Sequence, residues 1–452
     1  MAVACGPTLG KTAPSSVNRG VELEERLSSP THQTLENQTA MWCSGHRGQA
    51  ASYPAYSMKS MAGAPSHLQP QAPDDPAPWQ RPLAQALAGQ SASSRRQLRG
   101  LKSQLLDLAS NDYLGLSAHP AVVAAAQAAA AREGVGAGAS RLVCGSRPVH
   151  AQLEQALAAW LGRERVLLFP SGFQANLAAV GALADRHSLV LADRLIHHSL
   201  LTGVRASGAR LQRFRHNNLP HLEARLGAAR QRQPEQRLLV MAESLYSMEG
   251  TSPDGAALAA ICARHGAALL LDEAHALGVL GPGGRGLGYG ETQIALLCGT
   301  FGKAFGSGGA FLAGDALVME WLLQFSGPFR YTTALAPPLA AAALAALEHM
   351  QALERAGTPP GPALLERAGR WRDALEAAGW PRPPGTGPIL PLLVGDDQRA
   401  LELQQHLEQA GLLAVAIRPP TVPPGTARLR LVLRWDLPPG TLERLLKALG
   451  SP

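Results

Sequence analysis

Short, strongly apolar runs alternate with longer segments of helical pattern from residue 165 onward. Six such runs are RVLLF from 165, SLVLAD from 188, RLLVMAE from 237, ALLLDE from 268, IALLCGT from 294 and GAFLAG from 309. Runs this short and this apolar are typical of strands that are buried on both faces. The pattern predicts an α/β fold with a mostly parallel sheet, and in such sheets ligands bind at the carboxyl ends of the strands.

Proline at the start and glycine at the end mark two helices that precede these strands. Pro120 begins an alanine-rich helix that Gly134 ends, and Pro148 and Gly162 bound a second one. After YTT at 331–333 a long helix rich in alanine and leucine follows.

The pattern changes beyond residue 334. Strand-like runs ILPLLV from 389, LLAVAI from 412 and RLRLVL from 428 interleave with helical segments near 397–410 and 439–449, and the Pro/Gly-rich stretch 379–388 is typical of a loop. We expect four parts: a disordered or mis-started tail over 1–79, an N-terminal segment over 80–110, a large domain over 111–333 and a small C-terminal α+β domain over 334–452.

The composition of the 452 residues fits a globular chain, with 46% apolar residues and a mean hydropathy of −0.03. No apolar run approaches the roughly 18 residues that span a bilayer. The net charge of +7 is spread without a dense basic block, which argues against nucleic-acid binding. The five cysteines are scattered without paired metal-ligand spacing, so we expect reduced thiols, no metal site and a cytoplasmic protein.

Lysine is rare in this chain, and one lysine stands in a glycine-rich segment. Only five of the 41 Lys and Arg residues are lysines, and Lys303 is the only one between Lys102 and Lys447. Arginine stays protonated, whereas a lysine can lose its proton in a suitable environment and attack a carbonyl to form a Schiff base. The alternative is that Lys303 is an ordinary surface lysine. The neighbouring motifs distinguish these two possibilities.

The motif DEAH at 272–275 follows a predicted strand. A carboxylate there, Asp272, can hold a proton on a heterocyclic nitrogen, as pyridoxal chemistry requires, or it can simply cap a helix beside a packed His275. A helicase would need an upstream phosphate loop. None is present, since Leu297 occupies the required glycine position and Ala304 follows the lysine.

Two glycine-containing segments are candidate phosphate sites. The stretch from Gly281 matches the dinucleotide fingerprint, but Pro282 and further glycines follow in place of a helix, so a loop is the better interpretation. In FPSGFQAN at 169–176, Gly172 and Phe173 stand between a strand and a predicted helix, where free backbone amides bind phosphate well.

Further polar residues follow other predicted strands. His197 or His198 can stack on a flat ring, and Ser247 and Thr300 supply hydroxyl groups. Arg428 and Arg430 share a face of the last strand, and either can hold a substrate carboxylate through two hydrogen bonds.

Taken in order, these motifs resemble those of the α-oxoamine synthases, fold-type I pyridoxal 5'-phosphate (PLP) enzymes that condense an amino acid with an acyl thioester. The resemblance covers roughly residues 80 to 452. It is carried by SNDYLGL at 110–116, SGFQAN at 171–176, DEAH at 272–275, TFGKAFG at 300–306 and YTTAL at 331–335. The segment AIRPPTVPPGTARLRL at 416–431 is similar to the branch of that family that serves biotin synthesis.

The resemblance implies a large domain with a mostly parallel seven-stranded sheet, a smaller α+β domain and a homodimer with the site at the interface. It implies that Lys303, His197 and Asp272 are catalytic: Lys303 forms the Schiff base, Asp272 pairs with the pyridine nitrogen and His197 stacks on the ring. The implied cofactor contacts also include Gly172, Phe173, Ser247, His275 and Thr300. The implied substrate contacts are Asn111, Thr421, Arg430 and, among the candidates Arg95, Arg96 and Arg99, Arg95.

The implied reaction joins L-alanine to a pimeloyl group carried on coenzyme A or on acyl carrier protein, with loss of carbon dioxide. Siblings that use glycine or serine share the same catalytic residues and stay open as alternatives, as does a non-catalytic subunit of the same fold. The chain departs from the family pattern at Gly250-Thr251 and over RWDLPPG at 434–440.

Overall fold

The computed structural model describes residues 76–452 apart from 91–94, 97, 99 and 101–103. The chain divides into two units, Met1–Ala84 and Gln85–Pro452, and a short helix, α2 (Arg81–Ala88), crosses that boundary. The tail expected over 1–79 therefore lies almost wholly outside the described residues, as does Arg99. No helix in the described part of the chain is long and apolar enough to cross a membrane.

Seven strands form one mostly parallel sheet in the second unit, in the order β2-β8-β7-β6-β5-β3-β4. The pairs β3–β4, β3–β5, β5–β6 and β6–β7 are parallel, and β8 runs antiparallel to β2 and β7. The strands are β2 (Arg165–Phe169), β3 (Leu189–Asp193), β4 (Arg210–Phe214), β5 (Leu238–Glu243), β6 (Ala268–Asp272), β7 (Leu296–Thr300) and β8 (Ala310–Gly314). The α/β fold with a seven-stranded sheet is thus confirmed.

The six apolar runs of the sequence all form strands. The resemblance implied a seventh strand, but the apolar pattern did not locate it. The sequence of β4 is RLQRF, and only its last residue, Phe214, is buried. This strand lies at the edge of the sheet, where one side has no neighbouring strand, so polar side chains are tolerated. An edge strand of this kind lacks the continuous apolar signal on which the prediction relied.

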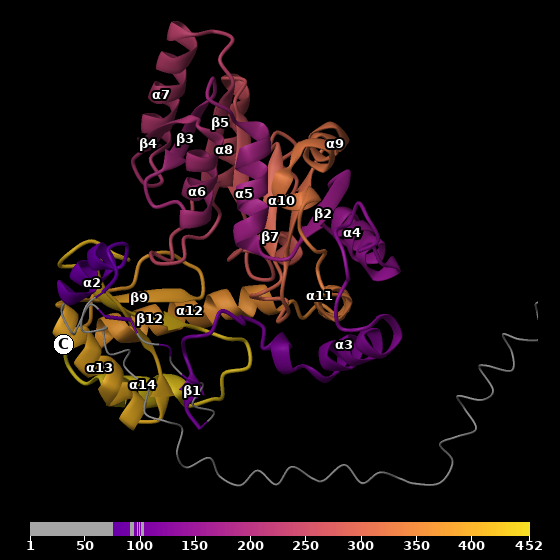
Figure 1. Ribbon diagram of the computed structural model, residues 1–452. Coiled ribbons are helices and arrows are strands. Elements are labelled where there is room, and N and C mark those ends of the chain that lie inside the picture. The colour runs from indigo at the N-terminus through magenta and orange to yellow at the C-terminus, as the bar shows by residue number, and fades with distance from the viewer. Residues whose placement is uncertain (1–75, 91–94, 97, 99, 101–103) are drawn as a thin grey trace, which may run out of the picture. The chain divides into compact units, whose positions relative to one another are not determined.

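Helices cover both faces of the sheet, and alternate residues of each central strand supply the two apolar cores (Figure 1). In β5, Leu239 and Met241 belong to one core and Leu238 and Val240 to the other. The first core includes residues of α5 (Gly172–Leu183), α6 (His198–Ser207), α9 (Ala316–Phe325) and α10 (Gly327–Arg330). The second core includes residues of α4 (Pro148–Leu161), α7 (Leu219–Arg232) and α8 (Gly255–Arg264).

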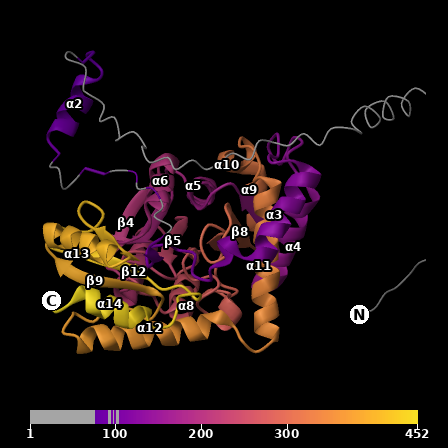
Figure 2. The same cartoon turned by 90° about the horizontal axis from the view of Figure 1, so that it is seen from below.

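The proline and glycine signals for two helices are confirmed. Helix α3 (Pro120–Glu133) has Gly134 as its C-cap, and α4 ends at Gly162 in the left-handed conformation, with φ of 63°. The long helix after residue 333 is α11 (Pro337–Arg355), and it packs against α3 and α4, as seen from below (Figure 2).

A second sheet of three strands follows, in the order β11-β12-β9. It consists of β9 (Ile389–Gly395), β11 (Val415–Ile417) and β12 (Ala427–Val432), all antiparallel, with α12 (Pro360–Ala377), α13 (Asp397–Gln409) and α14 (Thr441–Leu449) nearby. The short β1 (Leu106–Asp107) pairs with β10 (Leu412–Leu413), which joins the N-terminal segment to this region. The limits of the two expected domains stay a prediction.

The glycine-rich segment that matched the dinucleotide fingerprint forms turns around a single 3₁₀ turn, η2 (Pro282–Gly284), and no helix follows it. The Glu273 carboxylate accepts hydrogen bonds from the backbone amides of Gly288, at 2.6 Å, and Leu287, at 3.2 Å. Burial raises the pKa of Glu273 to about 7. Its role is to hold this loop, as the loop interpretation requires.

Candidate active site

A cavity of about 230 Å³ lies where several parallel strands of the large sheet end. Strands β3, β5, β6 and β7 run in the same direction, so the residues that follow them meet at one edge of the sheet. The wall comprises Gly172, Phe173, Asn176, His197, Ser199, Glu243, Asp272, Ala274, His275, Cys298, Thr300 and Lys303. Seven of the eight predicted cofactor residues are therefore brought together.

Lys303 lies in the turn after β7, and its backbone carbonyl accepts a hydrogen bond from Gly306 at 2.8 Å. Gly306 has φ of +61°, and a Cβ there would lie 2.2 Å from the backbone nitrogen of Ser117, so this turn requires glycine. Burial lowers the pKa of the Lys303 amine to about 8, although the charges of Asp272 and Glu243 oppose that change. Near neutral pH a useful fraction of the amine is therefore a free base.

Asp272 ends β6 and is tied to the cavity wall through both oxygens. Its Oδ1 accepts a hydrogen bond from the backbone of Ala274 at 3.0 Å, and its Oδ2 accepts one from Asn176 Nδ2 at 2.7 Å. The same Asn176 nitrogen donates to Ser199 Oγ at 3.0 Å. These bonds fix the carboxylate in the wall of the cavity that Lys303 also lines.

His197 and His198 are both exposed, but only His197 lines the cavity. Its Nδ1 accepts a hydrogen bond from the backbone of Ser199 at 3.3 Å and lies 2.7 Å from Ser199 Oγ. Desolvation of the ring nitrogens in the cavity lowers the pKa of His197; Asp272 opposes this change and the Lys303 amine adds to it. The lowered pKa favours the neutral ring, whose flat face is free to stack on another ring.

Glu243 ends β5 and is 4% exposed. Its Oε1 accepts a hydrogen bond from the backbone amide of His197 at 2.6 Å. Burial and the neighbouring Asp272 raise its pKa well above the usual range of a glutamic acid. Glu243 therefore holds the segment that carries His197.

His275 and Tyr113 form a buried pair beneath the cavity wall. Tyr113 is 0% exposed, His275 is 7% exposed, and Tyr113 Oη lies 2.6 Å from His275 Nδ1. Burial and the positive charges of Lys303 and Arg430 lower the pKa of His275 well below its usual value. Burial has the opposite effect on the phenol: it raises the pKa of Tyr113, although Arg430 opposes that change. Both side chains are neutral at physiological pH.

Gly172 and Phe173 are the first two residues of α5, and the Ser171 side chain caps that helix by accepting from Gln174. Their amides occupy the positions that an α-helix leaves without intrahelical partners, and the positive end of the helix dipole favours an anion there. Thr300 Oγ1 donates to the Gly309 carbonyl at 3.0 Å and accepts from Gly302 at 3.3 Å, so its hydroxyl proton is engaged within the loop.

Arg430 and Asn111 lie together outside the cavity wall. Arg430 Nη2 donates to Asn111 Oδ1 at 2.9 Å, and Arg430 Nε donates to the Ser247 carbonyl at 2.7 Å. Arg428 points to the same loop, where it donates to Met248 O and approaches Glu249 at 3.7 Å. Within the described residues Arg428 thus has a carboxylate neighbour, whereas no ion pair engages Arg430, which favours Arg430 as the carboxylate-binding arginine.

Ser247 does not line the cavity, and its contact with Arg430 is made by the backbone. Arg95 donates to the Leu87 carbonyl at 3.1 Å and, within the described residues, has no hydrogen bond to a predicted substrate residue. Its neighbour Arg96 instead donates to Thr421 Oγ1 at 2.9 Å. Among the described arginines of this segment, Arg96 is therefore the better candidate for the substrate contact.

Sequence reasoning missed four polar residues of the site: Asn176, Ser199, Glu243 and Tyr113. Each lies in or beside a segment that had been singled out, but only the fold places it against Asp272, His197 or His275. Of these four residues, Asn176 could have been found from the sequence. It lies in the middle of an otherwise apolar helix, α5, where an amide is costly to bury without a partner.

The residues present fit PLP. Asn176 Oδ1 is buried and has no partner among the described residues, which marks an unfilled polar position at the cavity wall. The donor set is also suitable: an amine of lowered pKa, a carboxylate for a pyridine nitrogen, a neutral ring to stack and a helix N-terminus for a phosphate.

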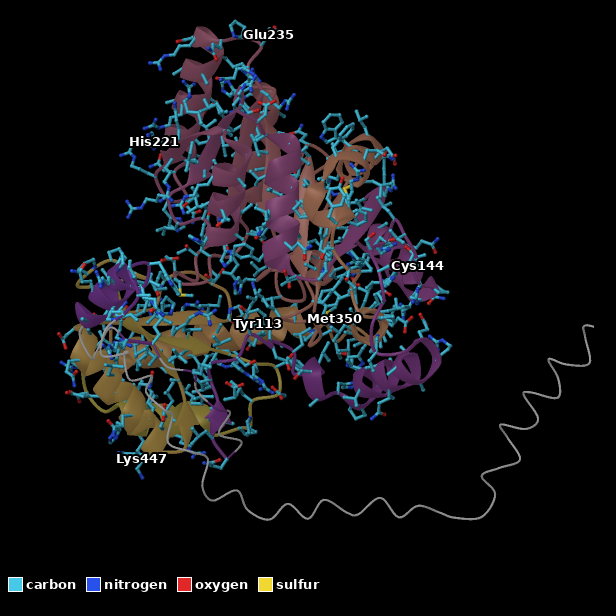
Figure 3. All side chains as sticks on the ribbon, in the orientation of Figure 1. Tyr113, Cys144, His221, Glu235, Met350 and Lys447 are labelled. Atoms are coloured by element: carbon cyan, nitrogen blue, oxygen red, sulfur yellow. The ribbon has the colours of Figure 1, made fainter. Side chains whose placement is uncertain are left out.

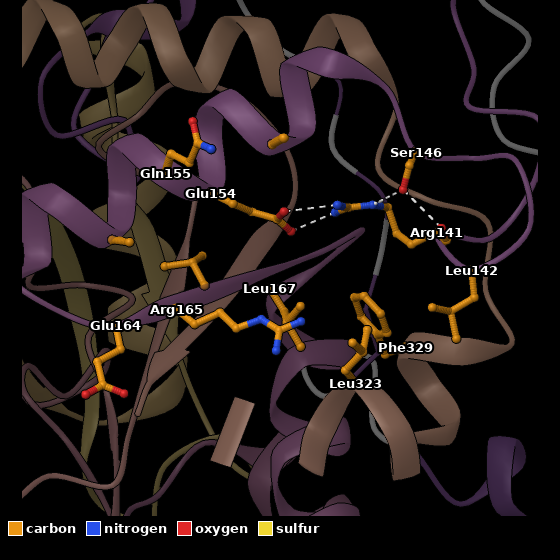
Figure 4. A pocket seen from close by; sticks show the side chains of 13 residues that line it. Arg141, Leu142, Ser146, Glu154, Gln155, Glu164, Arg165, Leu167, Leu323 and Phe329 are labelled. Carbon is orange, nitrogen blue, oxygen red and sulfur yellow. Dashed lines mark hydrogen bonds and ion pairs between the residues drawn. The ribbon is translucent and has the colours of Figure 1, made fainter. Parts of the chain in front are cut away.

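A larger cavity, of about 340 Å³, lies between α4, β2 and the α9–α10 region (Figure 4). Two of its charged residues are paired: Arg141 donates to both oxygens of Glu154, at 2.7 and 3.0 Å, and to Ser146 Oγ at 2.9 Å. No lysine, histidine or cysteine is among the described residues of its wall, so this cavity has no counterpart of the Lys303 amine.

Comparison with known proteins agrees with this geometry. The family model for class I and II aminotransferases matches residues 103–449. The chain is 45% identical to 8-amino-7-oxononanoate synthase of Stutzerimonas stutzeri over 352 residues, which cover 77% of this chain and 88% of that protein.

Two solved structures are similar as well. A serine palmitoyltransferase (SPT) structure with a PLP internal aldimine superposes with a TM-score of 0.73 at 28% identity, covering 81% of this chain and 94% of that one. The crystal structure of 8-amino-7-oxononanoate synthase from Francisella tularensis superposes with a TM-score of 0.65 at 26% identity, covering 77% and 96%.

Proposed function

The chain belongs to the class I and II aminotransferase family and, within it, to the 8-amino-7-oxononanoate synthases, and on that premise we propose that it condenses L-alanine with a pimeloyl thioester. It is a PLP-dependent acyltransferase of biotin biosynthesis. The proposed products are 8-amino-7-oxononanoate, carbon dioxide and the free carrier, which is coenzyme A or acyl carrier protein. The observation that carries this proposal is that the Lys303 amine, with its lowered pKa, and the Asp272 carboxylate line the same cavity.

When bound, PLP supplies a protonated ring that accepts the electron pair left when a proton leaves the amino acid. Asp272, whose Oδ2 is held by Asn176, provides the negative charge for that ring. Gly172 and Phe173 provide amides for the phosphate, and His197 provides a flat, neutral face.

Lys303 is the base of the proposed mechanism. Its Nζ, with a pKa of about 8, takes the proton from the α-carbon of the amino acid and returns a proton at the end of the reaction. Desolvation is the main reason for this low pKa, so the protein surroundings of the amine prepare it to act as a base.

Arg430 orients the amino acid by binding its carboxylate. Asn111 and the Ser247 carbonyl hold two edges of the guanidinium, so that its direction is fixed before substrate arrives. We further propose that Arg96 and Thr421, which are hydrogen-bonded to each other, contact the acyl substrate. The observed contacts support Arg96 for this role in place of Arg95.

A serine palmitoyltransferase activity is the second candidate, because the solved structure of that enzyme has the higher TM-score, 0.73 against 0.65. Sequence identity favours the first candidate, at 45% against 28%. A non-catalytic subunit is disfavoured because Lys303, Asp272 and Arg430 are all retained.

The assay that separates these candidates offers the purified full chain, with PLP, three amino acids and three thioesters. L-alanine, L-serine and glycine are each combined with pimeloyl-CoA, pimeloyl-acyl carrier protein and palmitoyl-CoA, and the product is identified by mass spectrometry. We expect 8-amino-7-oxononanoate from L-alanine and a pimeloyl donor. Turnover of L-serine with palmitoyl-CoA in place of that pair would overturn the substrate assignment.

We also propose a cytoplasmic homodimer. Large apolar side chains are exposed on adjoining segments: Val135 at 82%, Val143 at 77% and Tyr331 at 81%. Ala334 N donates to Ala139 O, which links the two segments that carry them. An exposed apolar patch of this kind is typical of an interface between subunits.

A further inference from the structure

The two histidines of the cavity are held in the same way, each through Nδ1. Ser199 Oγ lies 2.7 Å from His197 Nδ1, and Tyr113 Oη lies 2.6 Å from His275 Nδ1. Neither contact has been used in the mechanism above. Both, however, decide which ring nitrogen carries the proton, and a neutral imidazole has only one.

For His197 the direction of the hydrogen bond follows from its donors. The backbone amide of Ser199 donates to Nδ1, and Asn176 Nδ2 donates to Ser199 Oγ, so the Ser199 hydroxyl proton is left to point toward His197. An acceptor Nδ1 places the single proton of the neutral ring on Nε2.

For His275 the direction follows from the partners of Tyr113. Within the described residues, His275 Nδ1 is the acceptor that lies within hydrogen-bond distance of the Tyr113 hydroxyl. A phenol proton buried without an acceptor costs free energy, so the hydroxyl donates to His275 Nδ1. The 61° angle between the two rings brings the phenol to the edge of the imidazole, as this bond requires.

We propose that Tyr113 is a positioning residue that fixes His275 as the Nε2–H tautomer, so that the ring presents a neutral N–H donor to the cavity. Low exposure keeps the ring uncharged, because Tyr113, His275 and Arg430 are all buried, at 0%, 7% and 7% exposed. Lys303, Arg430 and His197 are the charged or titratable groups that act on His275, and each disfavours a second proton on it.

This inference rests on the proposed function, because the N–H donor of His275 serves a bound PLP. A bound PLP carries an oxygen anion on its ring, and an N–H donor stabilises such an oxygen, whereas a bare imidazole nitrogen repels it. The positive charge of Arg430, the proposed carboxylate-binding residue, also acts on the Tyr113 phenol that contacts His275. Tyr113 lies centrally, at the level of Met350 in the view with all side chains (Figure 3).

The test is the tautomer of His275, read by nitrogen NMR on the full chain with ¹⁵N-labelled histidine, before and after addition of PLP. The His275 signals are assigned by their loss in His275→Asn. We expect a protonated Nε2 and an unprotonated Nδ1 in the parent protein, and a mixture of both tautomers in Tyr113→Phe. Ser199→Ala is the matched control, since it should change the His197 signals and leave those of His275 unchanged.

A second readout is the affinity for PLP, measured by fluorescence quenching. The phenol-to-phenyl change should weaken binding by about tenfold, the effect of losing one well-placed hydrogen bond. A protonated Nδ1 in the parent protein, or an unchanged His275 spectrum in Tyr113→Phe, would overturn the proposal. The parent spectrum tests it even if the variant does not fold. Because no substrate is added, a failed condensation assay leaves this result standing.

Discussion

Two cavities in the described part of the chain, the one at the strand ends and the larger one beside α4, both contain charged groups but use them in opposite ways. In the larger cavity, beside α4, Arg141 and Glu154 neutralise each other through two hydrogen bonds, with side chains that are 14% and 16% exposed. In the cavity at the strand ends, the Lys303 amine has acidic neighbours, but its pKa is lowered to about 8 all the same.

The difference teaches what separates a structural ion pair from a reactive group. A paired charge stays charged and unavailable, because each partner satisfies the other. Lys303 is not paired in this way. The two oxygens of Asp272 accept hydrogen bonds from Asn176 and a backbone amide, and Glu243 accepts one from the backbone of His197. Desolvation therefore outweighs attraction, and the amine can lose its proton where chemistry needs a base.

The largest expected effect is that of Lys303→Ala. The variant should lose the yellow absorbance of enzyme-bound PLP that borohydride bleaches in the parent, and its turnover should fall by about 10²- to 10⁴-fold, the contribution of a positioned base. Lys447→Ala, in α14, is the matched control and should behave as the parent does. A reducible chromophore that persists in Lys303→Ala would mean that another amine is the attachment point.

A smaller effect on the same amine is expected for Asp272→Asn. The Asp272 charge raises the pKa of Lys303, so its removal should lower that pKa further below about 8, by about one unit. The measurement is the pH dependence of Lys303 acylation by an amine-reactive reagent, located by mass spectrometry. Since only the free base reacts, the labelling curve of the variant should move to lower pH.

Asp315→Asn is the control for that experiment, because Asp315 is an exposed N-cap residue of α9 without a side-chain capping bond. Its curve should coincide with that of the parent. A curve for Asp272→Asn that moved to higher pH would contradict the assignment of Asp272 as the charge that faces the amine.

The smallest effect on catalysis is expected for the paired cavity. Arg141→Met should leave turnover within about twofold of the parent, but should reduce the free energy of unfolding by about 1–2 kcal/mol, between the values for surface and buried pairs. Urea unfolding gives the stability and the condensation assay gives the turnover. A large loss of turnover at unchanged stability would show that this cavity serves the reaction, and the contrast between the two cavities would fail.

The sequence by itself determined most of the fold and the chemical identity of the site. Apolar runs such as ALLLDE predicted the central strands, because a strand that is buried on both faces must be apolar throughout. Lys303 was singled out by the scarcity of lysine, and Asp272 and His275 by their place after a predicted strand, whereas the roles of all three came from the family resemblance. The edge strand β4 was not located from the sequence, because a strand at a solvent-exposed edge does not need a continuous apolar sequence.

Only the tertiary structure decided which groups surround those residues. Sequence spacing does not predict contacts between segments that lie far apart in the chain. Such contacts pair Asn176 with Asp272, Glu243 with His197, Tyr113 with His275, and Arg96, not Arg95, with Thr421. The pKa of Lys303 belongs to the same class. It depends on how much water and how many charges lie near one amine, and packing sets both.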